Sequence, residues 1–373
     1  MTFVHGMWSI PLKKNCVRLV IGKRCLKRTH SLNIFMDSKQ QHKAALDDVN
    51  QKGHFVRRES QFRNWISREK IADFAAEPCR YHLYVSLACP WAHRTLIVRK
   101  LKGLEPVIGC TVVHYHMDSM GWRFIEPGEK VPFCTPDEIN GAKRLRDIYF
   151  QVDPGYDGRF TVPLLWDKKR KTIVNNESAE IIRMLNSEFN EFAENPALDL
   201  YPAELTSKID AINGVIYEVG CFSLDEKSTE ELQNVNNGVY KAGFARTQEA
   251  YEEAVTTLFH ELEHLEQILS KSRYLCGNQV TEADIRLFTT LIRFDAVYQY
   301  HFKCNLRPLY SFPNLHGFTL DMYQLPGVKE TVSFEHIKKH YYMSHPTINP
   351  FGIVPMGPKL DFSVSHNRDT QFS

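Results

Sequence analysis

The spacing of apolar and polar residues predicts a β-α-β order where regular patterning begins. Residues 81–87 form a short run rich in aromatic and β-branched positions, which favours a strand. A helix is expected next, because the following apolar residues fall on one helical face: Leu96, Ile97, Leu101 and Leu104. A second strand-like run, at 107–114, starts directly after Pro106.

The pattern continues through a long irregular segment to two more strands and a helix. Residues 115–158 mix Gly, Pro and charged residues, as in an insertion, and such long loops often carry function. Short strands are expected at 160–166 and 172–176, and a helix at 177–185. Because Pro163 cannot donate to a sheet, the strand that contains it is expected at an edge, or the proline has a special role. The order β-α-β-insertion-β-β-α predicts a thioredoxin-like α/β domain.

The pattern becomes mostly helical from about residue 198. Apolar positions with a clear 3-and-4 spacing fill residues 251–269: Val255, Leu258, Phe259, Leu262, Leu265, Ile268 and Leu269. Thr281 and Asp284 have the spacing of a capping box, so a helix is expected to begin there. A polar, acidic stretch at 220–236 interrupts the pattern, and it is either a surface loop or an error in the gene model. The second domain is therefore predicted to be all-α.

These patterns divide the chain into five segments. They are a basic N-terminal extension at 1–36, an irregular lead-in at 37–79, a thioredoxin-like domain at 80–190 with its insertion at 115–158, an all-α domain at 198–345 and a C-terminal tail at 346–373. A chain of 373 residues fits two folded domains of ordinary size.

Composition excludes several classes of function. The formal net charge of +2 is too small to indicate binding to nucleic acid or to a membrane surface, and no apolar run is long enough to span a bilayer. The nine cysteines have no C-x-x-C spacing, which argues against a disulfide framework and against a cysteine-rich zinc site. A reducing compartment fits this cysteine usage.

The first 36 residues have a composition of their own. Apolar residues lie there among basic ones, and no acidic residue occurs before Asp37. The seven basic residues are Lys13, Lys14, Arg18, Lys23, Arg24, Lys27 and Arg28. This composition is typical of a mitochondrial presequence. The alternative is an extension without a targeting role, or translation that starts at Met36. Mitochondrial and cytoplasmic locations therefore both stay open.

Cys89 is the strongest candidate for a catalytic residue. With Pro90 it lies between the first strand and the first helix, which places its sulfur at a helix N-terminus, where unpaired N–H groups favour an anion. A cysteine in this position has a lowered pKa and is a good nucleophile. Since the position three residues later is Ala92, the motif holds a single thiol, and a reduction cycle needs an external small-molecule thiol.

Two further motifs are compatible with a thiol peptide as that cosubstrate. A cis proline at Pro163 would leave the backbone of Val162 free to pair with an extended peptide. Glu177 and Ser178, at the start of a helix, can hold an ammonium and a carboxylate group. Each signal is weak by itself, because an edge-strand proline and an N-terminal Glu-Ser are common.

A competing motif is the zincin pattern H-E-x-x-H at His260–His264, which places both histidines on one face of a helix. A zinc hydrolase needs a third ligand, and no companion ligand motif follows. Leu262 and Leu265 instead give this segment the apolar face of an ordinary packed helix. We therefore expect no metal site.

Taken together, the motifs resemble the omega-like glutathione transferases, and more narrowly the xi-class transferases, also called glutathionyl-hydroquinone reductases. The resemblance spans about residues 55–358. It is carried by 86–94 (SLACPWAHR), 121–124 (GWRF), 159–163 (RFTVP), 175–178 (NNES), 236–244 (NNGVYKAGF), 275–286 (LCGNQVTEADIR) and 337–341 (IKKHY).

The resemblance implies roles for individual residues. Cys89 would be the nucleophile, Tyr240 the proton donor or acceptor, and Tyr298 and Tyr341 the residues that lower the cysteine pKa. The glutathione site would be lined by Trp122, Arg159, Phe160, Thr161, Val162, Glu177 and Ser178. This chain departs from the family at 295–298, where it has Asp-Ala-Val-Tyr in place of Asp-Pro-Val-Tyr, and the stretch at 220–236 could misplace Tyr240.

The resemblance also implies a reaction and partners. The expected activity is glutathione-dependent reduction of S-glutathionyl-hydroquinones through a mixed disulfide between Cys89 and glutathione, in a homodimer without a metal. Two alternatives stay open: a thiol transferase or dehydroascorbate reductase that uses the same cysteine, and a transferase-like binding module without catalytic activity.

Overall fold

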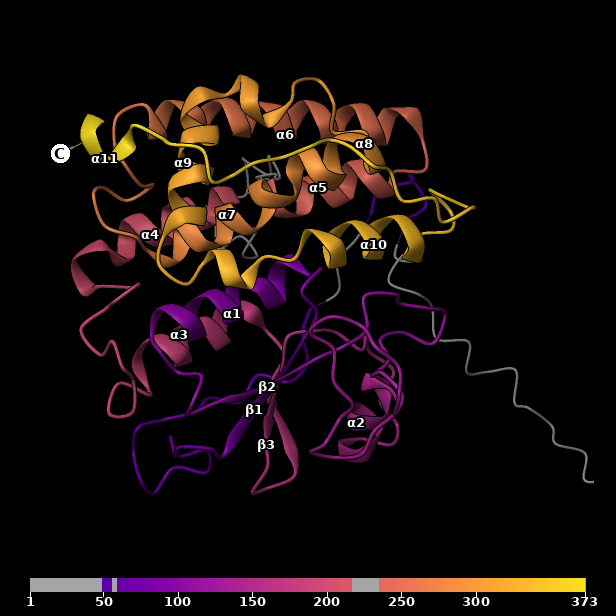
Figure 1. The fold of residues 1–373 in the computed structure, drawn as a ribbon, viewed down its shortest axis with the longest axis vertical. Helices are drawn as coiled ribbons and strands as arrows, with labels where there is room; N and C mark the ends of the chain where they lie inside the picture. The colour runs from indigo at the N-terminus through magenta and orange to yellow at the C-terminus, as the bar shows by residue number, and fades with distance from the viewer. Residues whose placement is uncertain (1–48, 56–58, 217–234, 373) are drawn as a thin grey trace, which may run out of the picture. The chain divides into compact units, whose positions relative to one another are not determined.

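A computed structural model of the chain describes residues 49–55, 59–216 and 235–372 (Figure 1). All of them belong to one compact unit, His42–Ser373. The predicted presequence at 1–36 lies outside the described residues, as does the stretch 220–234. In the part of the chain that the structure describes, no helix is both long enough and apolar enough to cross a membrane.

A four-stranded sheet forms the core of the first domain. Its strands are β1 (Tyr81–Val85), β2 (Gly109–Val112), β3 (Leu164–Asp167) and β4 (Thr172–Asn175), in the spatial order β2-β1-β3-β4. β1 pairs with β2 in parallel and with β3 antiparallel, and β3 pairs with β4 antiparallel. β3 begins only after Pro163, because a residue without an N–H cannot join the hydrogen-bond ladder. The predicted strand at 160–166 was thus too long at its start.

Two helices lie between the sheet and the second domain (Figure 1): α1 (Pro90–Leu101) and α3 (Ser178–Ser187) pack against each other. The expected insertion contains a helix that the pattern did not predict, α2 (Leu145–Val152). Its apolar residues Leu145, Ile148 and Tyr149 are buried, so the segment forms part of the core rather than a solvent-exposed loop.

The second domain is helical, as predicted. It comprises α4 (Thr206–Ile216), α5 (Val235–Phe244), α6 (Gln248–Leu269), α7 (Glu282–Arg293), the π-helix η2 (Phe294–Tyr298), α8 (Gln299–His301), α9 (Pro313–Gln324) and α10 (Phe334–Ser344), with 3-10 turns η1 (Ala203–Leu205), η3 (Leu309–Ser311) and η4 (Lys329–Thr331). The tail beyond α10 ends in α11 (Arg368–Gln371).

The helix α7 connects the two domains. It starts at the predicted capping box, in which the N–H of Thr281 donates to the carboxylate of Asp284 (2.8 Å), and every residue of the helix is buried. α7 packs against α1, the helix that begins after Cys89. Residues of the all-α domain are therefore brought directly beneath the Cys-Pro motif.

Candidate active site

Cys89 is the N-cap residue of α1. Its backbone is extended (φ −76°, ψ 122°), Pro90 occupies the first helical turn, and no acidic residue lies in that turn. The N–H groups of the first turn lack intrahelical partners, so they and the helix dipole favour a negative charge on the nearby sulfur. The thiol is half-buried, and its Sγ donates to the carbonyl oxygen of Val162 at 3.4 Å. The structure thus brings together two residues that sequence analysis had assigned to one site.

The loop before β3 carries four of the predicted glutathione-binding residues, 159–162. It enters β3 through a cis peptide bond between Val162 and Pro163. Tyr149 of α2 holds the loop, since its hydroxyl donates to the carbonyl of Thr161 (2.9 Å) and accepts from the amide of Asn176 (3.2 Å). The helix that the pattern missed therefore positions this loop.

Glu177 and Ser178 start α3 beside this loop. One carboxylate oxygen of Glu177 accepts from the N–H of Ala179 (3.0 Å), and the other accepts from the hydroxyl of Ser60 (3.1 Å). The Ser178 hydroxyl accepts from Arg94 of α1 at 3.4 Å, and Arg94 also donates to Asn236 of α5 at 3.0 Å. The N-terminus of α3 is thereby fixed relative to both domains.

Trp122, the remaining predicted glutathione contact, packs against α10. Its ring is stacked on His340, with ring centroids 4.7 Å apart and an angle of 25° between the planes. His340 is bonded through Nδ1 to the carbonyl of Tyr115 at 2.8 Å. Burial lowers the pKa of His340 to about 4, so its ring is neutral at physiological pH. The neutral ring next to Tyr341 provides a flat surface for the indole.

The three predicted tyrosines form one hydrogen-bonded chain. Tyr341 is bonded through its hydroxyl to the hydroxyl of Tyr240 and, at 3.0 Å, to that of Tyr298. The ring of Tyr240 also lies 4.9 Å from that of Trp91, the second residue after Cys89. Tyr240 belongs to α5, which brings its hydroxyl to that of Tyr341, so the segment at 220–236 has not moved it away from the other tyrosines.

The hydroxyls in this chain stay protonated at neutral pH. Burial raises the pKa of Tyr298, and it raises the pKa values of Tyr240 and Tyr341 well above their usual range. The negative charge of a Cys89 thiolate raises the pKa values of Tyr240 and Tyr298 further, since it opposes a second anion nearby. The tyrosines can therefore act as hydrogen-bond donors toward an anion at the sulfur or on a bound substrate.

Sequence reasoning missed two residues that belong to this region. Phe55, in the lead-in segment, is buried. Its ring centroid lies 6.5 Å from that of Tyr240 and 5.5 Å from that of Phe244. The guanidinium of Arg159 lies 5.7 Å from the same ring. Arg293, at the end of α7, bonds to the backbone next to Cys89. Neither residue belongs to a recognisable motif, and both reach the site only through the tertiary fold.

The zincin-like motif lies on the surface of α6. The side chains of His260 and His264 are 79% and 49% exposed, and each is paired only with Glu261 in the described residues. No group of three or more His, Cys, Asp or Glu side chains is arranged to hold a metal ion in the part of the chain that the structure describes. The structure thus offers no support for zinc chemistry at this motif.

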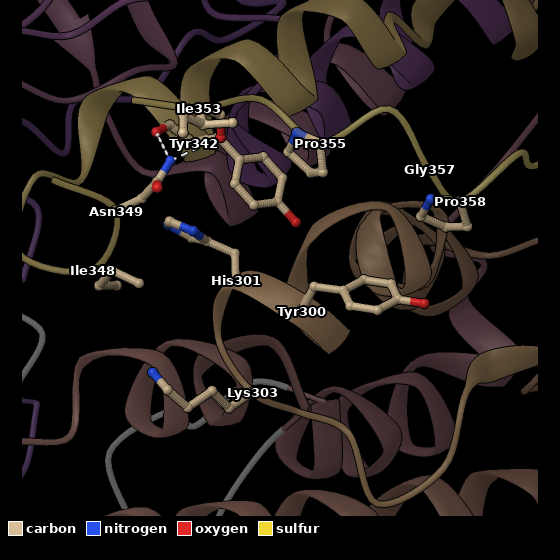
Figure 2. A pocket seen from close by; sticks show the side chains of 10 residues that line it. All are labelled: Tyr300, His301, Lys303, Tyr342, Ile348, Asn349, Ile353, Pro355, Gly357 and Pro358. Atoms are coloured by element: carbon tan, nitrogen blue, oxygen red, sulfur yellow. Dashed lines mark hydrogen bonds between the residues drawn. The ribbon is translucent and has the colours of Figure 1, made fainter. Parts of the chain in front are cut away.

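A separate cavity of about 570 Å³ lies between α8, α10 and the C-terminal tail (Figure 2). Its walls include the rings of Tyr300, His301 and Tyr342, and Pro355 and Pro358 of the tail. None of the predicted site residues lines this cavity, so it is distinct from the region around Cys89.

Comparison with known families gives two matches. The glutathione S-transferase N-terminal domain matches residues 88–188, and the glutathione S-transferase C-terminal domain matches residues 248–319. Glutathionyl-hydroquinone reductase YqjG of Escherichia coli (strain K12) is 52% identical over 86% of this chain and 94% of that protein. Glutathionyl-hydroquinone reductase PcpF of Sphingobium chlorophenolicum is 50% identical over 82% of this chain and 90% of that protein.

Solved structures agree with the sequence comparisons. The glutathione-bound structure of YqjG has a TM-score of 0.76 and covers 84% of this chain and 97% of its own. The xi glutathione S-transferase of Phanerochaete chrysosporium also has a TM-score of 0.76, at 53% identity, and covers 83% of this chain and 94% of its own. The predicted fold class and family resemblance are confirmed: the chain belongs to the glutathione transferase family, in its xi-class group of glutathionyl-hydroquinone reductases.

Proposed function

We propose that this protein reduces S-glutathionyl-hydroquinones to hydroquinones with glutathione as cosubstrate. The observation that carries the proposal is the position of Cys89 at the N-terminus of α1, next to the protonated tyrosine chain that begins at Tyr240. The two reductases that share half of their residues with this chain support the same substrate class. It is thus a glutathione-dependent enzyme.

The reaction proceeds in two successive displacements at the sulfur atoms, of which the second is a thiol–disulfide exchange. In the first, the Cys89 thiolate attacks the glutathione sulfur of the conjugate, a Cys89–glutathione disulfide forms, and the carbon–sulfur bond breaks with its electron pair on the aromatic fragment. That fragment takes up one proton and leaves as the hydroquinone. In the second, a glutathione thiolate attacks the mixed disulfide, which releases glutathione disulfide and returns the Cys89 thiolate. One glutathione thus supplies the thiolate and replaces the proton consumed.

The loop at 159–162, Trp122 and the start of α3 would hold the glutathione portion in both steps. The N–H of Val162 has no hydrogen-bond partner in the described residues, so it can pair with a peptide such as glutathione. Glu177 and Ser178 would bind its charged ends, with Arg159, Phe160 and Thr161 along the loop. In this arrangement the glutathione sulfur faces Cys89, because Val162 lies next to the thiol.

Tyr240 would serve as the proton donor, and Tyr298 and Tyr341 would stabilise the Cys89 thiolate. Because their hydroxyls are hydrogen-bonded to one another, the tyrosines can turn their O–H groups toward the negative charge as it moves from the sulfur to the departing aromatic fragment. The same elements could accept other substrates, so the assay must compare substrate classes.

The decisive assay is turnover of the purified protein on a glutathionyl-hydroquinone, such as a menadiol conjugate, with excess glutathione. We expect hydroquinone and glutathione disulfide in equal amounts. Dehydroascorbate is tested in parallel at matched concentrations. Faster turnover on dehydroascorbate would favour the thiol-transferase alternative, and no turnover on either substrate would favour a binding module.

Two broader properties are part of the proposal. Residues 1–36 would direct the protein to mitochondria, which a fusion of these residues to a fluorescent reporter tests; a cytosolic reporter would contradict it. The protein would also be a homodimer, which light scattering over a range of concentrations tests; a monomer mass throughout would contradict it.

A further inference from the structure

Arg293 connects the all-α domain to the backbone that presents Cys89. It is the last residue of α7 and is fully buried. Its Nε donates to the carbonyl of Ala88 (2.9 Å), its Nη2 to the carbonyl of Leu87 (3.1 Å) and its Nη1 to the carbonyl of Thr289 (2.7 Å). The guanidinium is therefore hydrogen-bonded to the carbonyls of the two residues that immediately precede the nucleophile.

The fourth contact of Arg293 fixes the protonation of His93. Nη1 lies 3.0 Å from Nδ1 of His93, and Nε2 of His93 lies 2.8 Å from the hydroxyl of Thr331. That hydroxyl donates its single proton to the carbonyl of Val328 (2.6 Å), so it must accept from His93. His93 therefore carries its proton on Nε2, and its Nδ1 accepts from Arg293. Burial, and then the charge of Arg293, hold the pKa of His93 well below its usual range.

Arg293 is consequently a buried cation whose acceptors are all neutral. In the described residues it bonds to three carbonyls and one neutral imidazole, and it forms no ion pair with a carboxylate. A buried charge without a counter-ion is costly. One group close to it that can carry a negative charge is the thiol of Cys89, the residue after Ala88, whose carbonyl Arg293 binds. The two charges act oppositely on Tyr298, where Arg293 lowers the pKa of the phenol and a Cys89 thiolate raises it.

We propose that Arg293 is a positioning residue for Cys89: it holds the Leu87 and Ala88 carbonyls so that the sulfur faces the open N–H groups of α1, and its charge favours the thiolate over the thiol. The inference rests on the proposed function of Cys89 and assigns the residue that prepares it for attack.

Elements near Cys89 carry other charged or titratable groups, and a substitution at Arg293 removes none of them. They are His93 and Arg94 of α1, Tyr240 of α5, Tyr298 of η2, Tyr341 of α10, Arg159 of the loop before β3 and Glu177 at the start of α3. His93 is bonded to Arg293, so its surroundings also change when the charge is removed. Arg293→Lys keeps a cation at this place and so separates the effect of the charge from that of the lost contacts. Arg286, on the same helix, is already paired with Glu282 at 2.8 Å.

The test is the pH dependence of Cys89 alkylation by iodoacetamide, followed by intact mass, in Arg293→Gln and Arg293→Lys. Gln removes the positive charge. Lys keeps the charge but cannot donate to the Leu87 and Ala88 carbonyls from two nitrogens at once. We expect the apparent pKa of Cys89 to rise by about one unit or more in Arg293→Gln. It should stay closer to the native value in Arg293→Lys, whose turnover should still fall.

Arg368→Gln is the matched control. Arg368 is also buried and also donates to carbonyls, those of Leu269, Ser272 and Arg273, but these lie at the C-terminal end of α6. Its loss should lower the melting temperature without moving the alkylation profile, which separates a general loss of stability from an effect on Cys89.

The outcomes distinguish this inference from the proposed function. If the native protein alkylates with a lowered pKa and folded Arg293→Gln has the same profile, the inference on Arg293 is wrong while the proposed function stands. If Cys89 of the native protein titrates like an ordinary thiol, the proposed function itself fails. Should Arg293→Gln not fold, Arg293→Lys decides, because native turnover in that variant would contradict the positioning role.

Discussion

The sulfur of Cys89 lies where neighbouring dipoles and hydroxyls all favour its anion. The first turn of α1 offers N–H groups and contains no acidic residue, and Pro90 adds no N–H that would need a partner. The tyrosine chain keeps its protons because its phenols are buried. A thiolate at this point lies at the N–H groups of α1, whereas the protonated thiol donates to the carbonyl of Val162.

The first prediction concerns the nucleophile. Cys89→Ser should lower turnover on a glutathionyl-hydroquinone by roughly 10³-fold or more, because a hydroxyl cannot form the mixed disulfide. Mass spectrometry after one turnover without free glutathione should find one glutathione on the native protein and none on the variant. Cys79→Ser is the control, since Cys79 is an exposed thiol away from the site, and it should retain activity. Substantial turnover in Cys89→Ser would contradict the mechanism.

The second prediction concerns Tyr240. Tyr240→Phe should lower kcat and kcat/KM together, by about 10²–10⁴-fold, because the hydroxyl acts on charge that develops only in the transition state. The phenyl ring keeps its packing on Trp91, so the melting temperature should change little. Normal turnover in this variant would show that the proton comes from elsewhere.

Tyr298→Phe provides the contrast. Tyr298 is fully buried, and its hydroxyl is bonded to that of Tyr341 at 3.0 Å. Its loss should raise the apparent pKa of Cys89 measured by alkylation and move the pH–rate profile to higher pH. The loss of turnover should therefore be smaller at high pH than at neutral pH. If both variants moved the alkylation profile equally, the division of roles between the two tyrosines would be wrong.

At the scale of elements, segments outside the thioredoxin-like pattern complete the site. Residues 49–55 dock on the all-α domain, where the N–H of Arg246 donates to the carbonyl of Gly53 (3.1 Å), and they place Phe55 against Tyr240. The insertion supplies Tyr149, which holds the loop at 159–162. The lead-in and the insertion therefore shape the space in which an aromatic substrate would lie next to the tyrosines.

The third prediction tests this role of the lead-in. Phe55→Leu should lower kcat/KM for a bulky naphthohydroquinone conjugate by about 2–10-fold, the range expected for loss of one aromatic contact. Turnover on a small aliphatic glutathionyl disulfide should change less, because that substrate does not reach the ring. Phe74→Leu is the control: Phe74 also lies in the lead-in but packs beside Arg170, away from the tyrosines. Equal losses on both substrates would indicate a structural role only.

Sequence patterns predicted the elements that depend on local spacing. The strand–Cys-Pro–helix unit and the capping box at Thr281 involve residues close together in the chain, so periodicity and helix-end preferences were sufficient. The boundary of β3 at Leu164 was missed because the apolar run begins earlier than the hydrogen-bond ladder. Arg293 lies 205 residues from Ala88 in sequence, and only the packing of α7 on α1 brings them together. The tyrosines were assigned through the family resemblance, since their residue type alone says nothing about proximity.

At the scale of the whole molecule, acid should destabilise the fold through buried histidines. Burial lowers the pKa of His82, His301 and His340 to about 4, and it holds the pKa of His93 and His345 well below the usual range. An unfolded histidine titrates near 6.5, so between about pH 6.5 and pH 4 the unfolded chain binds more protons than the folded one. Stability is therefore full above about pH 6.5 and falls as the pH decreases toward 4.

The loss of stability from the histidines in acid is larger than the gain from buried carboxyl groups. Each shift to about 4 corresponds to roughly 3 kcal/mol at most, lost progressively over that interval. Burial raises the pKa of Asp284 to about 6, which has the opposite sign, because its proton is bound more tightly in the folded state and adds stability as the pH falls. Burial also raises the pKa of Asp295, with the same sign. Two such carboxyls cannot offset the five histidines, so lowering the pH should destabilise the fold.

The fourth prediction is measured as the melting temperature between about pH 7.5 and pH 4.5. We expect little change above pH 6.5 and a steep decrease below it, as the buried rings become protonated on unfolding. In His301→Asn the slope should be shallower by about one proton, because Asn can still reach His345, to which His301 is bonded at 3.0 Å, yet does not titrate. His260→Asn, at a side chain that is 79% exposed, should leave the slope unchanged. A melting temperature that stayed constant down to pH 4.5 would mean that these histidines are protonated within the folded protein. The ring of His93 would then not be neutral, although its hydrogen bonds with Arg293 and Thr331 require it to be.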